Sequence, residues 1–386
     1  MNMITTTAAL ADFCAICAKH PYVTVDTEFL RERTYFSQLC LIQLAYPGND
    51  DTSGALIDTL APGLDLAPLY ELFRNESVMK VFHAARQDLE IFVLNDDVMP
   101  VPFFDTQVAA MVCGFGDQVG YDTLVRKISK AQIDKSSRFT DWSRRPLSEA
   151  QKTYALADVT HLRDVYEFLA AELKKRNRSH WVTEELAILT DPDTYRTDPE
   201  KAWERVKTRN YNGKFLAIVR ELAAFRETDA KTRDVPRSRV MKDDAILELA
   251  ALRPTNMEEL GRARLLQREG RKPAVSEAIL AAIARGIACP SNKQPKVAEP
   301  PQRKQGSGAL GDLLRVLLKA KSEGADVAAK LLANASDLDD LASEDAPDIP
   351  CMKGWRREVF GNDALRLKAG EIALSAGPKG VEIVEL

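Results

Sequence analysis

The stretch VTVDTEF at residues 23–29 constrains the fold more than any other part of the chain. Its β-branched and aromatic residues predict a β-strand. Side chains alternate between the two faces of a strand, so Thr24, Asp26 and Glu28 share one face. The other face carries Val23, Val25, Thr27 and Phe29. Neighbouring carboxylates repel each other, and burying them unpaired is costly. This face must therefore point into water, as an antiparallel edge strand allows, or meet a cation.

The composition is that of a soluble globular protein, with 45% hydrophobic and 28% charged residues among 386. This length predicts two or three domains. No apolar run is long enough to cross a bilayer. The N-terminus, MNMITTTAALADFCAICAKH, lacks the basic start of a secretory signal and predicts an amphipathic helix that ends near His20. We therefore expect a cytoplasmic protein with no membrane partner.

The cysteines and histidines indicate neither a disulfide framework nor a zinc site. The six cysteines are scattered over a long chain. Cys14 and Cys17 form a CxxC pair, but no second pair completes a zinc site, and both fit the apolar pattern of the first helix. Buried structural cysteines are the favoured interpretation. The four histidines show no metal-ligand spacing.

The charges are unevenly distributed along the chain. The net charge is −10 over 1–200, +10 over 201–310 and −4 over 311–386. A basic middle segment could bind a polyanion such as nucleic acid. A solvated, charged helical face is the alternative.

The apolar patterns predict an α/β region followed by two helical regions. We expect strands at 23–29, 39–46, 54–58 and 78–83, and helices at 66–74, 87–95, 104–113, 120–129 and 148–176. Short gaps between the early strands predict hairpins, and helices separate the later strands, which together indicate a mixed sheet. Ser148 and Gln151 form a capping-box signature for the last helix. The predicted divisions are 1–180, a connector at 181–209, a helical region at 210–290, a flexible linker at 291–308, and a helical region at 309–386 that closes with a short hairpin around 378–380.

Two further carboxylates bear on the problem of Asp26 and Glu28. Asp88 lies in the first turn of a helix, where its alternative role is to interact with the helix dipole. Asp158 lies four residues after Tyr154 on an apolar helix, where a Tyr–Asp hydrogen bond is the alternative. If the four carboxylates converge, divalent cations would relieve their repulsion. Oxygen ligands suit Mg²⁺ or Mn²⁺, and two such ions about 4 Å apart support phosphoryl displacement.

Three motifs in order carry a resemblance to a known family. They are DxE at Asp26–Glu28, HAxxxDL at His83–Leu89 and YxxxD at Tyr154–Asp158. With RTYFSQLCLIQLA (33–45), FFDTQVAAMVCG (103–114) and DKSSRFTDWSRRPL (134–147), they resemble ribonuclease D, of the DEDD superfamily of 3′-5′ exonucleases. Thr153 stands where the histidine subclass has its His, so the tyrosine subclass is indicated. Ala85 stands where a Gly is expected.

The resemblance implies an α/β RNase H-like exonuclease domain with a mixed sheet, followed by two mostly α-helical HRDC-like domains. Residues 210–290 resemble an HRDC domain, most clearly at DVPRSRVMKDD (234–244) and SEAILAAI. Residues 309–386 resemble a second, diverged copy, with Gly354-Trp355-Arg356 as its landmark. The acidic run at 336–348 argues against nucleic-acid contact by this second copy.

The implied function is a 3′-5′ exoribonuclease that trims RNA 3′ ends. The resemblance implies that the partner is RNA with a free 3′ end, in particular a tRNA precursor. It also implies hydrolysis with two divalent ions, Mg²⁺ or Mn²⁺, and release of 5′-mononucleotides. No obligate protein partner is implied. The expected metal ligands are Asp26, Glu28, Asp88 and Asp158, with Asp26 bridging the ions. Tyr154 is expected to orient the attacking water, because a phenol is a poor base at neutral pH.

The expected substrate contacts are Thr27, Phe29, His83, Lys135 and Arg138, with Arg144 and Arg145 in the same loop as the last two. Phe29 could stack on a base, or belong to the core because alternation turns it away from Asp26 and Glu28. The basic loop could hold phosphates or simply be solvated. A DNA 3′-5′ exonuclease and a catalytically silent RNA-binding protein are the rival interpretations.

Overall fold

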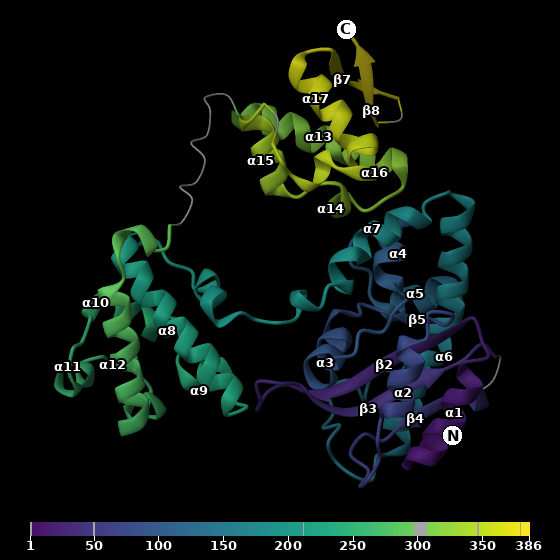
Figure 1. Cartoon of the computed structure of the whole chain (residues 1–386). Coiled ribbons are helices and arrows are strands. Elements are labelled where there is room, and N and C mark those ends of the chain that lie inside the picture. Colours follow the sequence, from purple (N-terminus) through teal and green to yellow (C-terminus); the bar gives the residue numbers. More distant parts are fainter. Residues whose placement is uncertain (1, 49–50, 211, 297–306, 346, 379) are drawn as a thin grey trace.

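The computed structural model describes residues 2–386 except 49–50, 211, 297–306, 346 and 379 (Figure 1). It consists of an N-terminal α/β domain and two helical modules. Within the described residues, no helix is both long enough and apolar enough to cross a membrane.

The N-terminal domain is built on one mixed sheet of six strands in the order β1-β4-β3-β2-β5-β6. The strands are β1 (Asn2–Ile4), β2 (Tyr22–Leu30), β3 (Gln38–Ala45), β4 (Gly54–Ile57), β5 (Met79–Phe82) and β6 (Phe103–Asp105). β2, β3 and β4 are antiparallel neighbours, which confirms the predicted hairpins. β1 pairs with β4, β5 with β2, and β6 with β5, all in parallel. The strand that carries the DxE motif therefore lies inside the sheet, not at its edge.

The described part of this domain contains the α-helices α1 (Thr7–Cys17), α2 (Ala67–Arg74), α3 (Arg86–Asp96), α4 (Thr106–Val112), α5 (Tyr121–Ile128), α6 (Glu149–Lys175) and α7 (Ser179–Thr190). α6 packs across β2, β3 and β4. Both hydrogen bonds of the predicted capping box at Ser148 are present. Thr24 Oγ1 donates to the Val159 carbonyl at 2.8 Å, so the face of β2 that also carries Asp26 and Glu28 lies against α6.

Several short elements differ from the sequence prediction. β1, β6 and α7 were not predicted, and the first helix ends at Cys17 instead of near His20. The helix predicted from residue 104 begins at Thr106, because Asp105 ends β6 and caps α4 by accepting the N–H groups of Gln107 and Val108. A three-residue strand shows no detectable alternation, so only its pairing with a neighbour identifies it.

The first helical module contains α8 (Gly213–Thr232), α9 (Arg237–Val240), α10 (Asp243–Leu252), α11 (Met257–Gly261) and α12 (Pro273–Ala288) around its own buried core. It meets the N-terminal domain at the loop between β2 and β3 (Figure 1). There the backbone N–H groups of Tyr35 and Phe36 donate to Asp234 at 3.0 Å. The Tyr35 hydroxyl donates to the buried Glu227. Most of the predicted linker that follows, 297–306, lies outside the described residues.

The second helical module contains α13 (Ser307–Ala325), α14 (Ala329–Leu332), α15 (Ala335–Ser343), α16 (Gly354–Arg356), a π-helical turn (Arg357–Gly361) and α17 (Asn362–Ala369). The predicted hairpin is present as β7 (Ile372–Gly377) and β8 (Gly380–Glu385). This module rests on α7 (Figure 1), where Trp355 stacks on Trp181 with ring centroids 4.2 Å apart. Its buried apolar residues are continuous with the core of the N-terminal domain. The first module thus contacts the α/β domain through hydrogen bonds at the β2–β3 loop, whereas the second module shares a buried apolar core with it.

Candidate active site

Three carboxylates meet where the end of β2 lies against α6. Asp26 and Glu28 project from the same face of β2, and Asp158 projects from α6, one residue before the carbonyl that Thr24 binds. One carboxylate oxygen from each of the three lies within 4.8 Å of the others. The hydrogen bond from Thr24 to the Val159 carbonyl of α6 therefore sets the position along β2 at which Asp158 lies beside the strand.

Asp88, on α3, lies beside these three carboxylates: it lines the same cavity, and its charge acts on Asp26 and Glu28. It is 7% exposed and accepts a hydrogen bond from the hydroxyl of Thr27, which projects from the opposite face of β2 to Asp26. The turn into α3 is held by Asp105, whose carboxylate accepts the N–H groups of Ala84 and Ala85 at 3.0 and 2.9 Å. Ala84, not Ala85, has the positive φ of this turn, so the expected glycine is not required at Ala85.

Burial raises the pKa values of all four carboxylates, and the charges of neighbouring cluster carboxylates add to this at Asp26 and Glu28. Burial, followed by the charges of Asp158 and Asp88, raises the pKa of Glu28 to about 9. Burial also raises the pKa values of Asp88 and Asp158 to about 7 each. The pKa of Asp26 is raised by burial and then by the charges of Asp158, Asp88 and Glu28. An arrangement that disfavours its own ionisation is a mark of a functional site.

No ion pair involves any of the four carboxylates within the described residues. The charge of Arg138 lowers the pKa values of Glu28 and Asp158, but it does not offset the effect of burial. A cluster of acidic oxygens with no basic partner fits hard divalent cations, which prefer such ligands.

Tyr154 lies on α6, one turn before Asp158, and its hydroxyl is hydrogen-bonded to that carboxylate. Burial and the neighbouring negative charges raise the pKa of the phenol, so it keeps its proton at neutral pH. Its ring lies 6.1 Å from that of the buried Trp142. Tyr154 is therefore placed to donate a hydrogen bond in the cluster, not to act as a base.

The cluster opens into a cavity of about 540 Å³. All five expected substrate contacts line it: Thr27, Phe29, His83, Lys135 and Arg138. Phe29, which alternation turns away from the carboxylates, lines the same cavity as Asp26 and Glu28. The extra residue Cys40 on β3 bulges the pairing between Glu28 and Phe29.

Two of the basic loop residues do not reach the cavity. Arg144 and Arg145 are absent from its lining. Arg145 instead binds Asp58 at 2.6 Å and the carbonyls of Cys40 and Trp142 at 2.7 Å, so it anchors the loop to the sheet. In the same loop Lys135 pairs with Asp122 at 2.8 Å. His83 places Nδ1 2.9 Å from the Thr106 hydroxyl.

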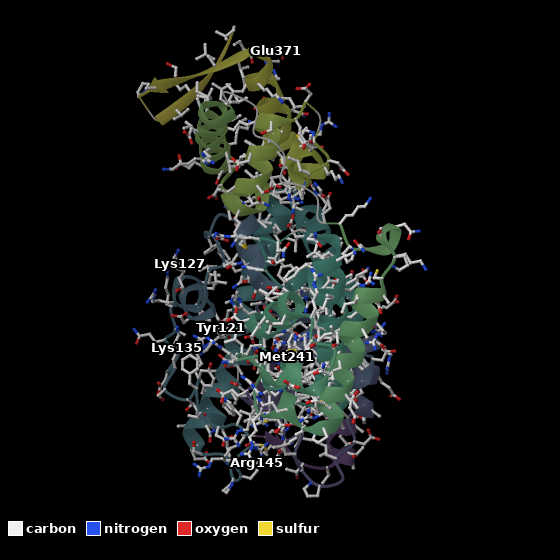
Figure 2. The ribbon with its side chains drawn as sticks, turned by 90° about the vertical axis from the view of Figure 1, so that its left-hand side faces the viewer. Tyr121, Lys127, Lys135, Arg145, Met241 and Glu371 are labelled. Atoms are coloured by element: carbon white, nitrogen blue, oxygen red, sulfur yellow. The ribbon has the colours of Figure 1, made fainter. Side chains whose placement is uncertain are left out.

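Sequence reasoning missed several residues of the cavity wall, among them Gln87, Gln107, Tyr121 and Phe139. Tyr121 donates to the Ala157 carbonyl at 3.1 Å, and Figure 2 shows it on the same side of the domain as Lys135. Gln87, Gln107 and Phe139 lie inside the quoted motif stretches, which was the available signal. No periodicity distinguishes a wall residue in a loop or at a helix start.

Two known families match separate parts of the chain. A family described as 3′-5′ exonuclease matches residues 1–174. The HRDC domain matches residues 215–283, within the first helical module. The HRDC-like character of the second helical module remains a prediction.

The chain is similar to curated proteins over its full length. It is 62% identical to a ribonuclease D from Jannaschia sp. (strain CCS1), over 100% of both chains. It is 53% identical to a ribonuclease D from Acidiphilium cryptum, over 100% of this chain and 97% of the relative. The crystal structure of Escherichia coli RNase D, an exoribonuclease involved in structured RNA processing, matches with a TM-score of 0.81 and 30% identity, over 95% of this chain and 99% of that one.

Proposed function

We propose, from the premise that this chain belongs to the ribonuclease D family of 3′-5′ exoribonucleases, that the carboxylate cluster on β2, α3 and α6 is where it hydrolyses RNA. The enzyme is a hydrolase of phosphodiester bonds, and its superfamily uses divalent metal ions. The observation that carries the proposal is the convergence of Asp26, Glu28 and Asp158, with oxygens within 4.8 Å and no basic partner.

Asp26, Glu28, Asp88 and Asp158 would hold two divalent ions, Mg²⁺ or Mn²⁺. Such ions, when bound, generate a nucleophile from water at neutral pH and stabilise the charge on a leaving oxygen. The donor set supports this assignment, because four acidic side chains from β2, α3 and α6 supply only hard oxygen ligands. Asp26 would be a central ligand of this set, since one of its carboxylate oxygens lies within 4.8 Å of those of Glu28 and Asp158.

The remaining residues would position the substrate. Tyr154, which keeps its proton, would orient the attacking water toward the terminal phosphate through its hydroxyl oxygen. Arg138 and Lys135 carry the positive charges of the cavity wall and would contact the RNA backbone. Each cycle would release one 5′-mononucleotide from the 3′ end.

The physiological substrates we propose are tRNA precursors. Residues 201–310 carry a net charge of +10, and the matched HRDC domain lies within them. A basic module attached beside the β2–β3 loop could hold the body of a structured RNA while its 3′ end enters the acidic cavity. The second module, with its acidic run at 336–348, would contribute packing instead of RNA contacts.

The catalytic assignment is tested with a 3′-labelled precursor tRNA, a matched DNA strand, and Mg²⁺, Mn²⁺ or EDTA. We expect stepwise, metal-dependent release of mononucleotides from RNA. Asp26→Asn and Asp158→Asn should each reduce the rate by at least about 100-fold, the usual scale for loss of a preorganised charged group. Asp164→Asn, on the exposed side of the same helix as Asp158, is the control. Undiminished hydrolysis by either cluster variant would refute the assignment.

The role of the basic segment 201–310 is tested by charge removal. Truncation is unsuitable, because the second module shares a core with the N-terminal domain. A triple change of the exposed Lys207, Arg209 and Lys214 to Gln should weaken RNA binding and lower the salt slope by roughly 0.7 per lost phosphate contact. Lys319→Gln, in the second module, is the control. An unchanged affinity and salt slope would show that these residues do not hold RNA.

A further inference from the structure

Phe139 is the most exposed of the large hydrophobic side chains in the described part of the chain, at 90%. An isolated apolar residue on a surface is ordinary. Phe139, however, lies on the wall of the cavity that also contains Asp26 and Glu28. A ring that is open to solvent beside a catalytic cluster has a face free to contact what enters.

The loop around Phe139 is anchored on both sides. Ser137 is 5% exposed, and its carbonyl accepts the N–H and the hydroxyl of Thr140 at 3.2 and 2.7 Å. Gln151 of α6 donates to the Thr140 hydroxyl at 3.0 Å, and Trp142 is 2% exposed. The residues next to Phe139 are thus fixed while its own side chain is not covered. A side chain presented by an anchored loop loses less conformational freedom when it binds.

The surroundings of Phe139 are cationic. The Arg138 guanidinium lies 5.1 Å from the centre of the Phe139 ring, and Lys135 lines the same cavity. Arg138 is also close enough for its charge to act on Glu28 and Asp158. An aromatic face next to positive charges is the combination with which proteins bind single-stranded nucleic acid: bases stack on the ring and phosphates meet the cations.

We propose that Phe139 is a stacking platform for an unpaired base in the 3′ segment of the RNA, near the nucleotide held at the carboxylates. This inference rests on the proposed function and adds a base-binding subsite to it. Stacking accepts every base, because each has a π-face. The platform therefore selects an unpaired strand without selecting its sequence, so paired nucleotides at the 3′ end would bind poorly.

The test measures binding separately from hydrolysis. Full-length protein carrying Asp158→Asn is titrated, with Mg²⁺ present, into a fluorescent RNA hairpin with a short unpaired 3′ tail. Phe139→Ala should raise Kd about 5- to 100-fold, the scale of one lost base stack. Phe139→Trp should restore binding. Ile188→Ala, which truncates another exposed apolar residue at 66% exposure outside the cavity wall, is the control and should leave Kd unchanged.

Abasic tails identify the contact itself. Removing the base at one tail position should weaken binding to the protein with Phe139 and have no further effect on the Phe139→Ala variant. Equal Kd values for these two proteins, or equal abasic penalties in both, would overturn the platform and indicate that the exposed ring serves another partner. Failure of the proposed function would instead appear as absent mononucleotide release by the unmodified enzyme. The two failures are therefore distinguishable.

Discussion

Removing one carboxylate from the cluster should stabilise the metal-free protein. The pKa of Asp158 is raised from 3.8 to about 7, mainly by burial, so the folded protein binds its proton more tightly than the unfolded chain does. A raised carboxylate pKa means that stability is lost as pH rises from about 4 through about 7. At pH 8 with EDTA the folded state therefore carries the full cost of the ionised Asp158, and Asp158→Asn removes it.

The size of the effect follows from the shift. Each pKa unit corresponds to 1.36 kcal/mol, so a rise of about three units sets an upper limit of about 4 kcal/mol. The charges of Asp88 and Glu28 still act on Asp26 in the variant, so part of the repulsion persists. We expect a gain of roughly 1–3 kcal/mol, which for a domain of this size raises Tm by about 3–10 °C.

Thermal unfolding followed by circular dichroism in EDTA at pH 5 and pH 8 measures this gain. The variant's gain should be smaller at pH 5, where less than half of the cost has accumulated because the folded Asp158 is still protonated, and should reach its full size at pH 8. Asp164→Asn controls for the loss of one negative charge from the same helix. Addition of Mg²⁺ should stabilise the unmodified protein more than Asp158→Asn, because binding to the folded state raises stability. A variant no more stable than the unmodified protein at pH 8 would refute the picture of mutually repelling carboxylates.

Three further predictions concern single side chains. Tyr154→Phe should lower kcat about 10- to 100-fold, because the phenol orients the attacking water; single-turnover kinetics measure this loss. The rise in Tm caused by Mg²⁺ should persist in this variant, because Tyr154 is not an expected metal ligand, and thermal unfolding with Mg²⁺ checks it. Glu227→Gln should destabilise the first module by about 1–3 kcal/mol, which urea unfolding measures. The Arg237 guanidinium lies 2.5–2.6 Å from the Glu227 oxygens and would lose this charged partner. Trp355→Ala should cost about 3–5 kcal/mol and increase hydrogen exchange in α7, because the stack on Trp181 is buried; unchanged exchange would contradict the shared core.

Local patterns in the sequence determined the central elements and the chemistry of the site. Alternation in VTVDTEF identified β2 and placed Asp26 and Glu28 together, and the helical spacing of Tyr154 and Asp158 placed both on one face of α6. The capping box at Ser148 identified the start of that helix. These features depend on neighbours only a few residues apart, so a single sequence contains them.

Only the tertiary structure decided what depends on distant partners. Asp88 reaches the cluster through the hydroxyl of Thr27, 61 residues away along the chain. Arg145 is held by Asp58 and Cys40, which removes it from the cavity, whereas Phe139 a few residues earlier is left open to solvent. Arg145 and Phe139 lie in the same loop, whose sequence shows no regular alternation of polar and apolar residues. Their roles differ because packing against other elements determines which side chains are covered, and no local periodicity records that packing.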